Sequence, residues 1–179
     1  VLHDFRFLSK WQQHQYQLIV EYVSDDSISG EEKSVKELLI GFRTIELIQE
    51  NIEDNNNGTS FYFKINSIPI FIKGANVVPL DAFDGRVTEI ELKRLFIAIS
   101  QSHMNLIRNW GGGIYQSDYF YTLASQYGIM IWEEFMFACS MYPNDDEFLN
   151  NVQEEIIYQS KRLVSYSSVI LFSANNENE

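Results

Sequence analysis

The residues with the clearest chemical potential lie in the stretch NNENE, residues 175–179. A carboxylic acid such as Glu177 can give a proton to the oxygen of a glycosidic bond, and amide side chains can hydrogen-bond sugar hydroxyls. The apolar run at residues 169–172 precedes this stretch and is typical of a strand buried on both faces. In parallel α/β sheets, ligand chemistry lies at the carboxyl ends of strands. The stretch therefore suggests acid/base chemistry on a sugar, whereas an isolated Asn-Asn-Glu favours a solvated loop.

Three further predicted strands also end in polar or aromatic side chains. Residues 70–76 (IFIKGAN) end at Asn76. Residues 104–110 (MNLIRNW) end with Arg108, Asn109 and Trp110 before a glycine triplet, and residues 129–135 (IMIWEEF) carry Glu133 and Glu134. Glycoside hydrolysis needs groups of this kind at one end of a barrel: a flat indole, amides, an arginine and carboxylates.

Predicted helices alternate with these strands. Thr88, with Glu91 three residues later, forms a capping box that begins a helix reaching about residue 102. Ser117 begins a second helix that Gly128 ends, and Asp145 or Asp146 begins a third that reaches about residue 165. Four strands in this order predict an α/β fold, the first half of a (β/α)8 TIM barrel. A doubly wound sheet is the alternative, although no Gly-x-Gly-x-x-Gly follows the first strand.

The amino-terminal part of the chain has the pattern of antiparallel β-structure. Polar and apolar residues alternate over 15–23, and further strand-like runs occupy 34–48, 61–65 and 68–72. Asn66-Ser67 suits a hairpin turn. We therefore expect residues 1–66 to be the end of an immunoglobulin-like β-sandwich domain and residues 67–179 to be the amino-terminal half of a catalytic barrel.

Composition limits the classes of function. The 179 residues carry a formal net charge of −12, which argues against nucleic acid or an anionic membrane as a partner. No apolar run approaches the roughly 20 residues that span a bilayer. His3, His14 and His103 lack the spacing of metal ligands, so we predict no metal and no cofactor. The apolar context of Cys139, the one cysteine, predicts a buried, inert thiol.

Two features concern the wider polypeptide. The sequence starts at Val1 without a Met, and we expect it to be an internal piece of a longer chain. Asn57 begins an Asn-Gly-Thr acceptor for N-glycosylation in a polar loop, which is accessible if the protein is secreted.

The ordered blocks FRTIEL, FYFKIN, PIFIKGAN, NLIRNWGGGIY, FMFAC, KRL and ANNENE resemble the lysosomal β-mannosidases of glycoside hydrolase family 2. The resemblance covers nearly all of residues 40–179, and WGGGIY and NNENE are its most specific parts. It implies a retaining exo-acting hydrolase that removes terminal non-reducing β-D-mannose from oligosaccharides of glycoproteins. It also implies a lysosomal or secreted location.

The resemblance also implies roles for four residues. Glu177 falls at the acid/base position, and Asn176 falls where an amide binds the sugar 2-hydroxyl. Arg108 falls where an arginine steadies the nucleophile, and Trp110 where an aromatic side chain lines the pocket. The nucleophile is a glutamate on a later strand of the family barrel. We therefore expect the isolated chain to be inactive.

Several positions depart from the family pattern and leave alternatives open. These positions are Val77, Asn109, Gln116, Phe172 and Ala174. The alternatives are another family-2 glycosidase, such as a β-galactosidase or β-glucuronidase, and a non-catalytic carbohydrate-binding relative. The sequence does not determine the glycan cleaved, the pH optimum or the oligomeric state.

Individual residues carry alternatives as well. Glu179 competes with Glu177 for the acid role. The apolar neighbours of Arg108 favour a buried position with a carboxylate partner. Glu133 and Glu134 are interpreted as solvated strand-end charges, and Trp132 as a core residue.

Overall fold

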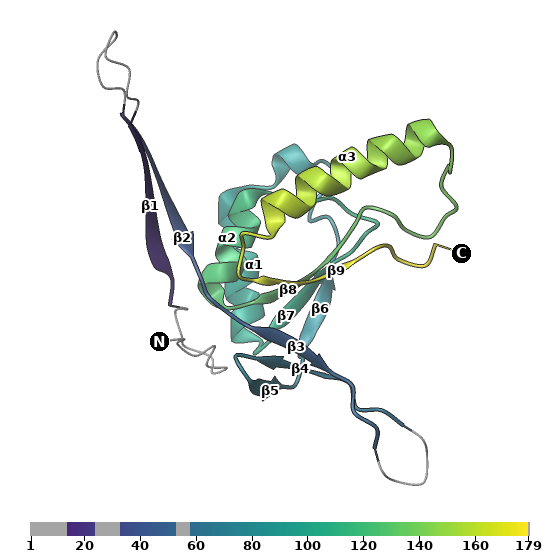
Figure 1. Ribbon diagram of the computed structural model, residues 1–179, viewed down its shortest axis with the longest axis horizontal. Coiled ribbons are helices and arrows are strands. Elements are labelled where there is room, and N and C mark those ends of the chain that lie inside the picture. Colours follow the sequence, from purple (N-terminus) through teal and green to yellow (C-terminus); the bar gives the residue numbers. More distant parts are fainter. Residues whose placement is uncertain (1–13, 24–32, 53–57, 179) are drawn as a thin grey trace.

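A computed structural model describes residues 14–23, 33–52 and 58–178 of the chain (Figure 1). It is an α/β fold in which antiparallel strands precede a parallel sheet with helices. The antiparallel strands are β1 (Tyr16–Val23), β2 (Lys33–Ile40), β3 (Ile45–Ile48), β4 (Tyr62–Ile65) and β5 (Ile68–Ile70). The remaining elements are β6 (Gly74–Val77), a 3-10 turn η1 (Asp84–Arg86), α1 (Glu89–Gln101), β7 (Leu106–Asn109), α2 (Asp118–Tyr127), β8 (Met130–Glu134), α3 (Asp146–Leu163) and β9 (Val169–Ser173).

The later strands form one four-stranded sheet in the order β6-β7-β8-β9, and every neighbouring pair is parallel. This confirms the predicted parallel order and agrees with the predicted alternation of strands and helices. The first parallel strand begins at Gly74, later than the predicted residue 70. The side chain of Asn105 explains the delay, because it accepts a hydrogen bond from the Lys73 N–H at 2.8 Å and donates to the Phe71 carbonyl at 2.9 Å.

The predicted helix boundaries follow local signals. Thr88 accepts a hydrogen bond from the Glu91 N–H, and the Glu91 carboxylate accepts from the Thr88 N–H, which completes the capping box of α1. Asp145 caps α3, and Gly128 ends α2 in the left-handed conformation at φ 67°. Ser117 occupies the N-cap position of α2 without a side-chain cap bond. None of the described helices combines the length and apolarity needed to cross a membrane.

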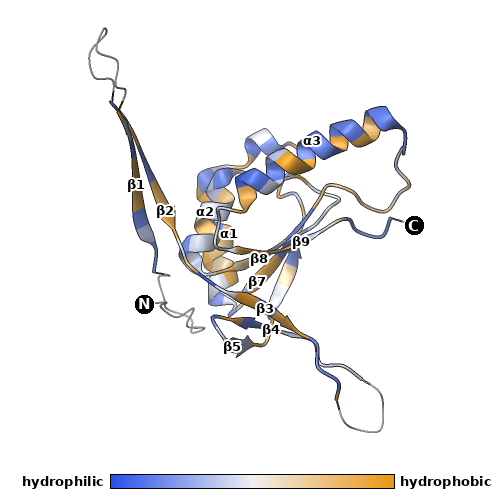
Figure 2. Cartoon of the chain, in the orientation of Figure 1, coloured by the Kyte–Doolittle hydropathy of each residue, from blue (hydrophilic) through white to orange (hydrophobic). Residues whose placement is uncertain are grey.

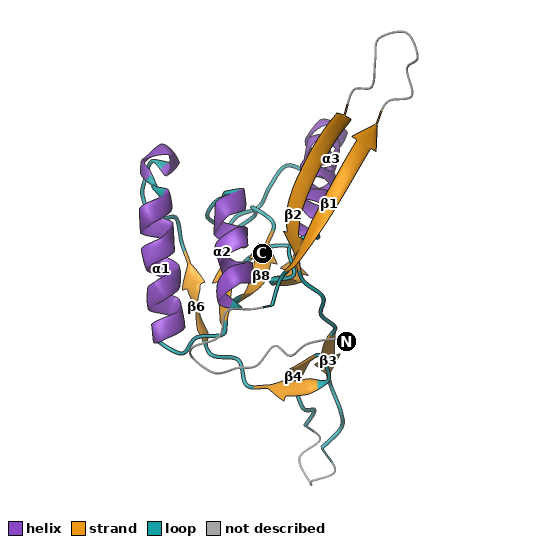
Figure 3. Cartoon of the chain, turned by 90° about the vertical axis from the view of Figure 1, so that its left-hand side faces the viewer, coloured by secondary structure: helices purple, strands orange, loops and turns teal. Residues whose placement is uncertain are grey.

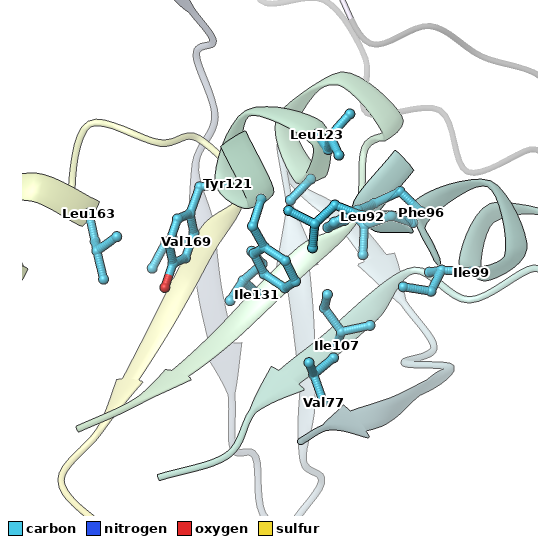
Figure 4. Packing of buried hydrophobic residues seen from close by; sticks show 13 residues of the cluster. Val77, Leu92, Phe96, Ile99, Ile107, Tyr121, Leu123, Ile131, Leu163 and Val169 are labelled. Atoms are coloured by element: carbon cyan, nitrogen blue, oxygen red, sulfur yellow. The ribbon is translucent and has the colours of Figure 1, made fainter. Parts of the chain in front are cut away.

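One face of the parallel sheet packs against the helices (Figure 4). Each strand supplies apolar side chains to this face, and α1 and α2 cover them. Figure 2 shows that α3 carries both hydrophilic and hydrophobic residues. This hydrophobic core consists of Val77, Leu92, Phe96, Ile99, Ile107, Phe120, Tyr121, Leu123, Ala124, Ile129, Ile131, Leu163 and Val169. Because side chains alternate along a strand, Arg108 and Glu134 point to the opposite face from Ile107 and Glu133.

The amino-terminal end of that opposite face is covered by the antiparallel sheet β3-β4-β5. Ile65 and Ile70 pack against Leu106 and Met130, which lie at the starts of β7 and β8. The β4–β5 hairpin turns at Asn66 and Ser67, whose φ values of 49° and 65° fit the predicted tight turn. Because the antiparallel sheet covers the amino-terminal end of this face, a ligand site can form only at the carboxyl ends of the parallel strands.

Strands β1 and β2 form a separate antiparallel ribbon that extends away from the parallel sheet (Figures 1 and 3). Most of its side chains are exposed, including Leu18, Val20 and Leu38. The segment that follows the ribbon is fastened to the parallel sheet by Arg43, which donates hydrogen bonds to the Ser167 carbonyl at 2.6 Å and to the Val169 carbonyl.

Candidate active site

Arg108 joins the carboxyl ends of the parallel strands. Its Nε and Nη2 donate to the two carboxylate oxygens of Glu134, each at 2.9 Å, in the bidentate geometry that makes Arg–carboxylate pairs strong. Nη1 donates to Asn76 Oδ1 at 3.1 Å, and Nη2 also donates to Asn176 Oδ1 at 2.6 Å. One guanidinium on β7 thus connects β6, β8 and the segment after β9.

Glu134 is fully buried, and donors occupy both of its oxygens. Besides Arg108, the Gly111 N–H donates to Glu134 Oε2 at 2.9 Å. Gly111 approaches so closely that a Cβ there would lie 2.6 Å from the Phe135 carbonyl oxygen, so no larger residue fits without a shift. Glu134 therefore acts as an anchor for Arg108 and the glycine loop rather than as an accessible reactive group.

Asn176 and Glu177 lie where the sheet continues beyond its regular strands. The Asn176 N–H donates to the Phe137 carbonyl at 2.9 Å, and the Cys139 N–H donates to the Asn176 carbonyl at 2.8 Å. Asn176 Nδ2 lies 3.3 Å from Cys139 Sγ, so Arg108 and Cys139 fix both ends of the Asn176 amide. Glu177 is exposed and has a φ of 53°, a left-handed turn that follows this fixed amide directly.

Trp110 lies one residue beyond β7 and is half-buried. A Cβ on Gly112 would lie 2.2 Å from the Trp110 ring, which shows that the indole lies over the backbone of the glycine triplet. The glycines therefore allow the loop to fold back under its own tryptophan. Trp132, on the same face of β8 as Glu134, is half-buried, and the Arg108 guanidinium lies 5.4 Å from its ring centroid.

A second polar cluster lies behind the sheet, on its helix face. Glu133 is fully buried there; its Oε1 accepts from Asn109 Nδ2 at 2.8 Å, and its Oε2 accepts from the Tyr121 hydroxyl at 3.0 Å. Gln116 Nε2 donates to Asn109 Oδ1 at 3.3 Å. Burial raises the pKa of Glu133 to about 7, although both hydrogen bonds oppose the rise. Burial also raises the pKa of Tyr121.

The chain is similar to known β-mannosidases over most of its length. No protein-family model matches the chain. The β-mannosidase of Bos taurus is 51% identical over 148 residues, which are 83% of this chain and 16% of the bovine protein. The crystal structure of the β-D-mannosidase from Dictyoglomus thermophilum superposes with a TM-score of 0.72 at 44% identity, covering 83% of this chain and 17% of that one. The chain is homologous to one segment of the β-mannosidases.

A more distant structure extends the fold comparison. A β-glucuronidase from Parabacteroides merdae has a TM-score of 0.72 at 18% identity, over 90% of this chain and 18% of that chain, and so shares the fold. The chain spans about a sixth of the length of the bovine β-mannosidase.

The structure confirms one of the predictions made from the sequence about individual residues and contradicts two. Arg108 has the buried carboxylate partner that its apolar neighbours suggested. Glu133 and Glu134 are buried on opposite faces of β8, so their interpretation as solvated charges is wrong. Cys139 is exposed rather than buried, and it lies beyond the carboxyl end of β8. Asn57, His3 and Glu179 lie outside the described residues.

Sequence reasoning missed three contributors to the candidate site: the anchoring role of Glu134, the Gly111 N–H, and Asn76 as a partner of Arg108. A usable signal was present for Glu134. Two consecutive acids at the end of an apolar strand must point to opposite faces of the sheet, so one of them lies on the same face as Arg108 and can pair with it.

Proposed function

We propose that this chain supplies the acid/base half of the active site of a retaining exo-β-mannosidase. Its substrates would be oligosaccharides of glycoproteins with terminal non-reducing β-D-mannose. The Arg108-centred cluster is the observation that carries the proposal, because it gathers amide and carboxylate groups from β6, β8 and the segment after β9 at one end of a parallel sheet. That end is where α/β enzymes hold their substrates.

In this proposal Glu177 is the general acid/base. It is exposed, so it can reach a substrate, and it directly follows Asn176, whose amide Arg108 and Cys139 orient. The protonated carboxyl gives its proton to the glycosidic oxygen as that bond breaks, and the resulting carboxylate then takes a proton from the water that cleaves the glycosyl-enzyme. Asn176 would bind the sugar 2-hydroxyl, and Trp110 would offer an apolar face to the ring.

A retaining mechanism also needs a nucleophilic carboxylate about 5–5.5 Å from the acid. Glu134 is unsuited to this role, because Arg108 and the Gly111 N–H occupy both of its oxygens. As the family resemblance implies, we assign the nucleophile to a glutamate on a later strand of the barrel, and we assign to Arg108 the role of steadying it.

The fold supports a wider architectural proposal. The sheet β6-β7-β8-β9 with its helices would be the first half of a (β/α)8 barrel beginning near residue 67. The β1–β2 ribbon would belong to an immunoglobulin-like sandwich within residues 1–66, because a two-stranded ribbon with exposed apolar side chains needs further strands for stability. A lysosomal or secreted location, with glycosylation at Asn57, completes the proposal.

The test uses the full-length protein with two isosteric variants, Glu177→Gln and Glu179→Gln. Glu177→Gln should slow natural β-mannosides, which have poor leaving groups, by about 10²–10⁴-fold. It should slow the first step on an activated nitrophenyl β-mannoside much less, and azide should rescue the second step. The matched Glu179→Gln variant should lack this signature. If Glu179→Gln carries the signature instead, the acid/base assignment is wrong by two residues.

The sugar is tested with the same protein. Nitrophenyl β-mannoside, β-galactoside and β-glucuronide are compared at equal concentration, and the β-mannoside should have the highest kcat/KM. Preference for another glycoside would replace the proposed substrate with that of a different family-2 enzyme. A folded protein that turns over none of the three would point to a non-catalytic relative.

A further inference from the structure

The buried cluster behind the sheet meets the candidate site through the glycine loop. Asn109 Nδ2, which donates to Glu133, also donates to the Ile114 carbonyl at 3.0 Å. The loop between Asn109 and Ile114 contains Gly111, whose N–H donates to Glu134. A displaced Asn109 side chain would therefore release one end of the loop that holds Glu134 and, through it, Arg108.

The cluster also connects both neighbouring helices to β8. Tyr121 of α2 donates to Glu133, while Arg162 of α3 donates to the Gln116 carbonyl at 3.2 Å and lies 5.3 Å from the Tyr121 ring centroid. Gln116 in turn holds Asn109. Asn109 and Gln116 are two of the positions at which the sequence departs from the family pattern. They are linked to Glu133 in sequence, because Gln116 donates to Asn109 and Asn109 donates to Glu133.

We propose that Glu133 is a positioning residue for the candidate site, and that it does this work as a neutral carboxylic acid. Its partners, Asn109 and Tyr121, are uncharged, and no cation forms an ion pair with it among the described residues. Asn109 Nδ2 can only donate, so in the neutral acid the proton belongs on Oε2; the 3.0 Å hydrogen bond then runs from Oε2–H to the Tyr121 hydroxyl oxygen, because a hydroxyl accepts as well as donates. Buried carboxyls without a cation favour the neutral form.

The charges around Glu133 support this assignment. Arg162, the nearest cation of α3, is paired with Asp118 at 2.6 Å, and Glu134 on the other face of β8 is paired with Arg108. Burial is the largest cause of the raised pKa of Glu133, which reaches about 7. The titratable and charged groups that act on Glu133 from its own side of the sheet are Tyr115, Tyr121 and Arg162, and Glu134 acts on it from the opposite face of β8.

The sign of the pH effect follows. A carboxyl whose pKa rises from 4.5 to about 7 on folding favours the folded state fully below pH 4.5, and this contribution is lost as the pH rises to 7. From well below pH 4.5 to well above pH 7 the folded-to-unfolded ratio should fall by about 300-fold in total. Glu133→Gln has the same shape and no ionisation, so it should remove this part of the pH dependence.

The first measurement is unfolding by urea at pH 4.5 and pH 8 for the full-length wild type, Glu133→Gln and the control Glu154→Gln, which changes an exposed glutamate of α3. Between these two pH values the folding equilibrium constant of the wild type and of the control should fall about 150-fold more than that of Glu133→Gln. Equal losses in all three proteins would overturn the neutral-acid assignment. This measurement does not depend on enzyme activity, so it tests the protonation state of Glu133 even if the proposed function is wrong.

The second measurement rests on the proposed function and tests positioning. If the ionised form of Glu133 misplaces the glycine loop, the ratio of kcat/KM at pH 8 to that at pH 5 should be about tenfold higher in Glu133→Gln than in wild type. A merely structural residue would leave this ratio unchanged, and that result would refute positioning. Wild-type protein without β-mannosidase turnover would refute the proposed function alone.

Discussion

Replacing Glu134 by Gln tests the central anchor of the candidate site. The substitution keeps the shape of the side chain and exchanges one acceptor oxygen for an NH₂ group. Oε1 accepts from Arg108, and Oε2 accepts from both Arg108 and the Gly111 N–H. In either orientation of the new amide, its NH₂ group faces an N–H donor of Arg108 or Gly111. The Arg108 charge also loses its carboxylate partner.

The magnitude follows from burial and from the partners that remain. Removing one member of a buried ion pair costs about 3–5 kcal/mol. The Arg108 side chain keeps 20% of its surface exposed and retains hydrogen bonds to Asn76 and Asn176, so part of its charge stays solvated and paired. We therefore expect a loss near the lower limit, about 3 kcal/mol in the free energy of unfolding.

The assay is urea denaturation of the full-length protein, with hydrogen exchange of residues 104–110 and 129–135 to localise the weakened region. Glu154→Gln is the control and should stay within about 0.5 kcal/mol of wild type, since that exposed side chain makes no hydrogen bond or ion pair in the described part of the chain. In an Arg108→Met background, Glu134→Gln should cost at least about 1.5 kcal/mol less. A cost that is unchanged in that background, or a single-variant cost below about 1 kcal/mol, would show that the pair is not an anchor.

Two further predictions concern the scaffold. A Cβ on Gly74 would lie 1.9 Å from the Leu106 carbonyl oxygen, so Gly74→Ala should cost about 3 kcal/mol or more, or yield insoluble protein, whereas Gly85→Ala, with nothing within 4 Å, should be nearly neutral in the same unfolding assay. Thr88→Ala removes the acceptor for the Glu91 N–H and should cost about 1 kcal/mol; a Thr88→Ser variant, which keeps the acceptor, should restore most of that loss, and failure to do so would argue against the cap.

The parts of the fold that follow from short-range signals were predictable from the sequence. The capping box at Thr88 and the left-handed Gly128 both depend on residues within one helical turn. The hairpin at Asn66 and Ser67 is equally local. The parallel order followed from the alternation of these elements. The partner of Arg108 was predictable in kind, because a charge between apolar neighbours in a strand needs a counter-charge.

The features that escaped prediction depend on residues distant in sequence. β6 begins at Gly74 because the Asn105 side chain forms hydrogen bonds with the backbone of Phe71 and Lys73. No residue near position 70 indicates this contact in the sequence. Cys139 sits in an apolar segment, yet its environment is set by Asn176, to which its backbone is bonded across the sheet. The same holds for Glu133, whose burial follows from the side chains of the helices that cover β8.

The order of strands in the parallel sheet bears on how the protein is made. Strands adjacent in β6-β7-β8-β9 are also consecutive along the chain, so each new strand pairs with the one synthesised just before it. Arg108 of β7 is therefore synthesised before Glu134, and Asn176 comes last of the three. During translation, Arg108 therefore has only its β6 partner Asn76 until β8 has been synthesised and Glu134 can supply the carboxylate.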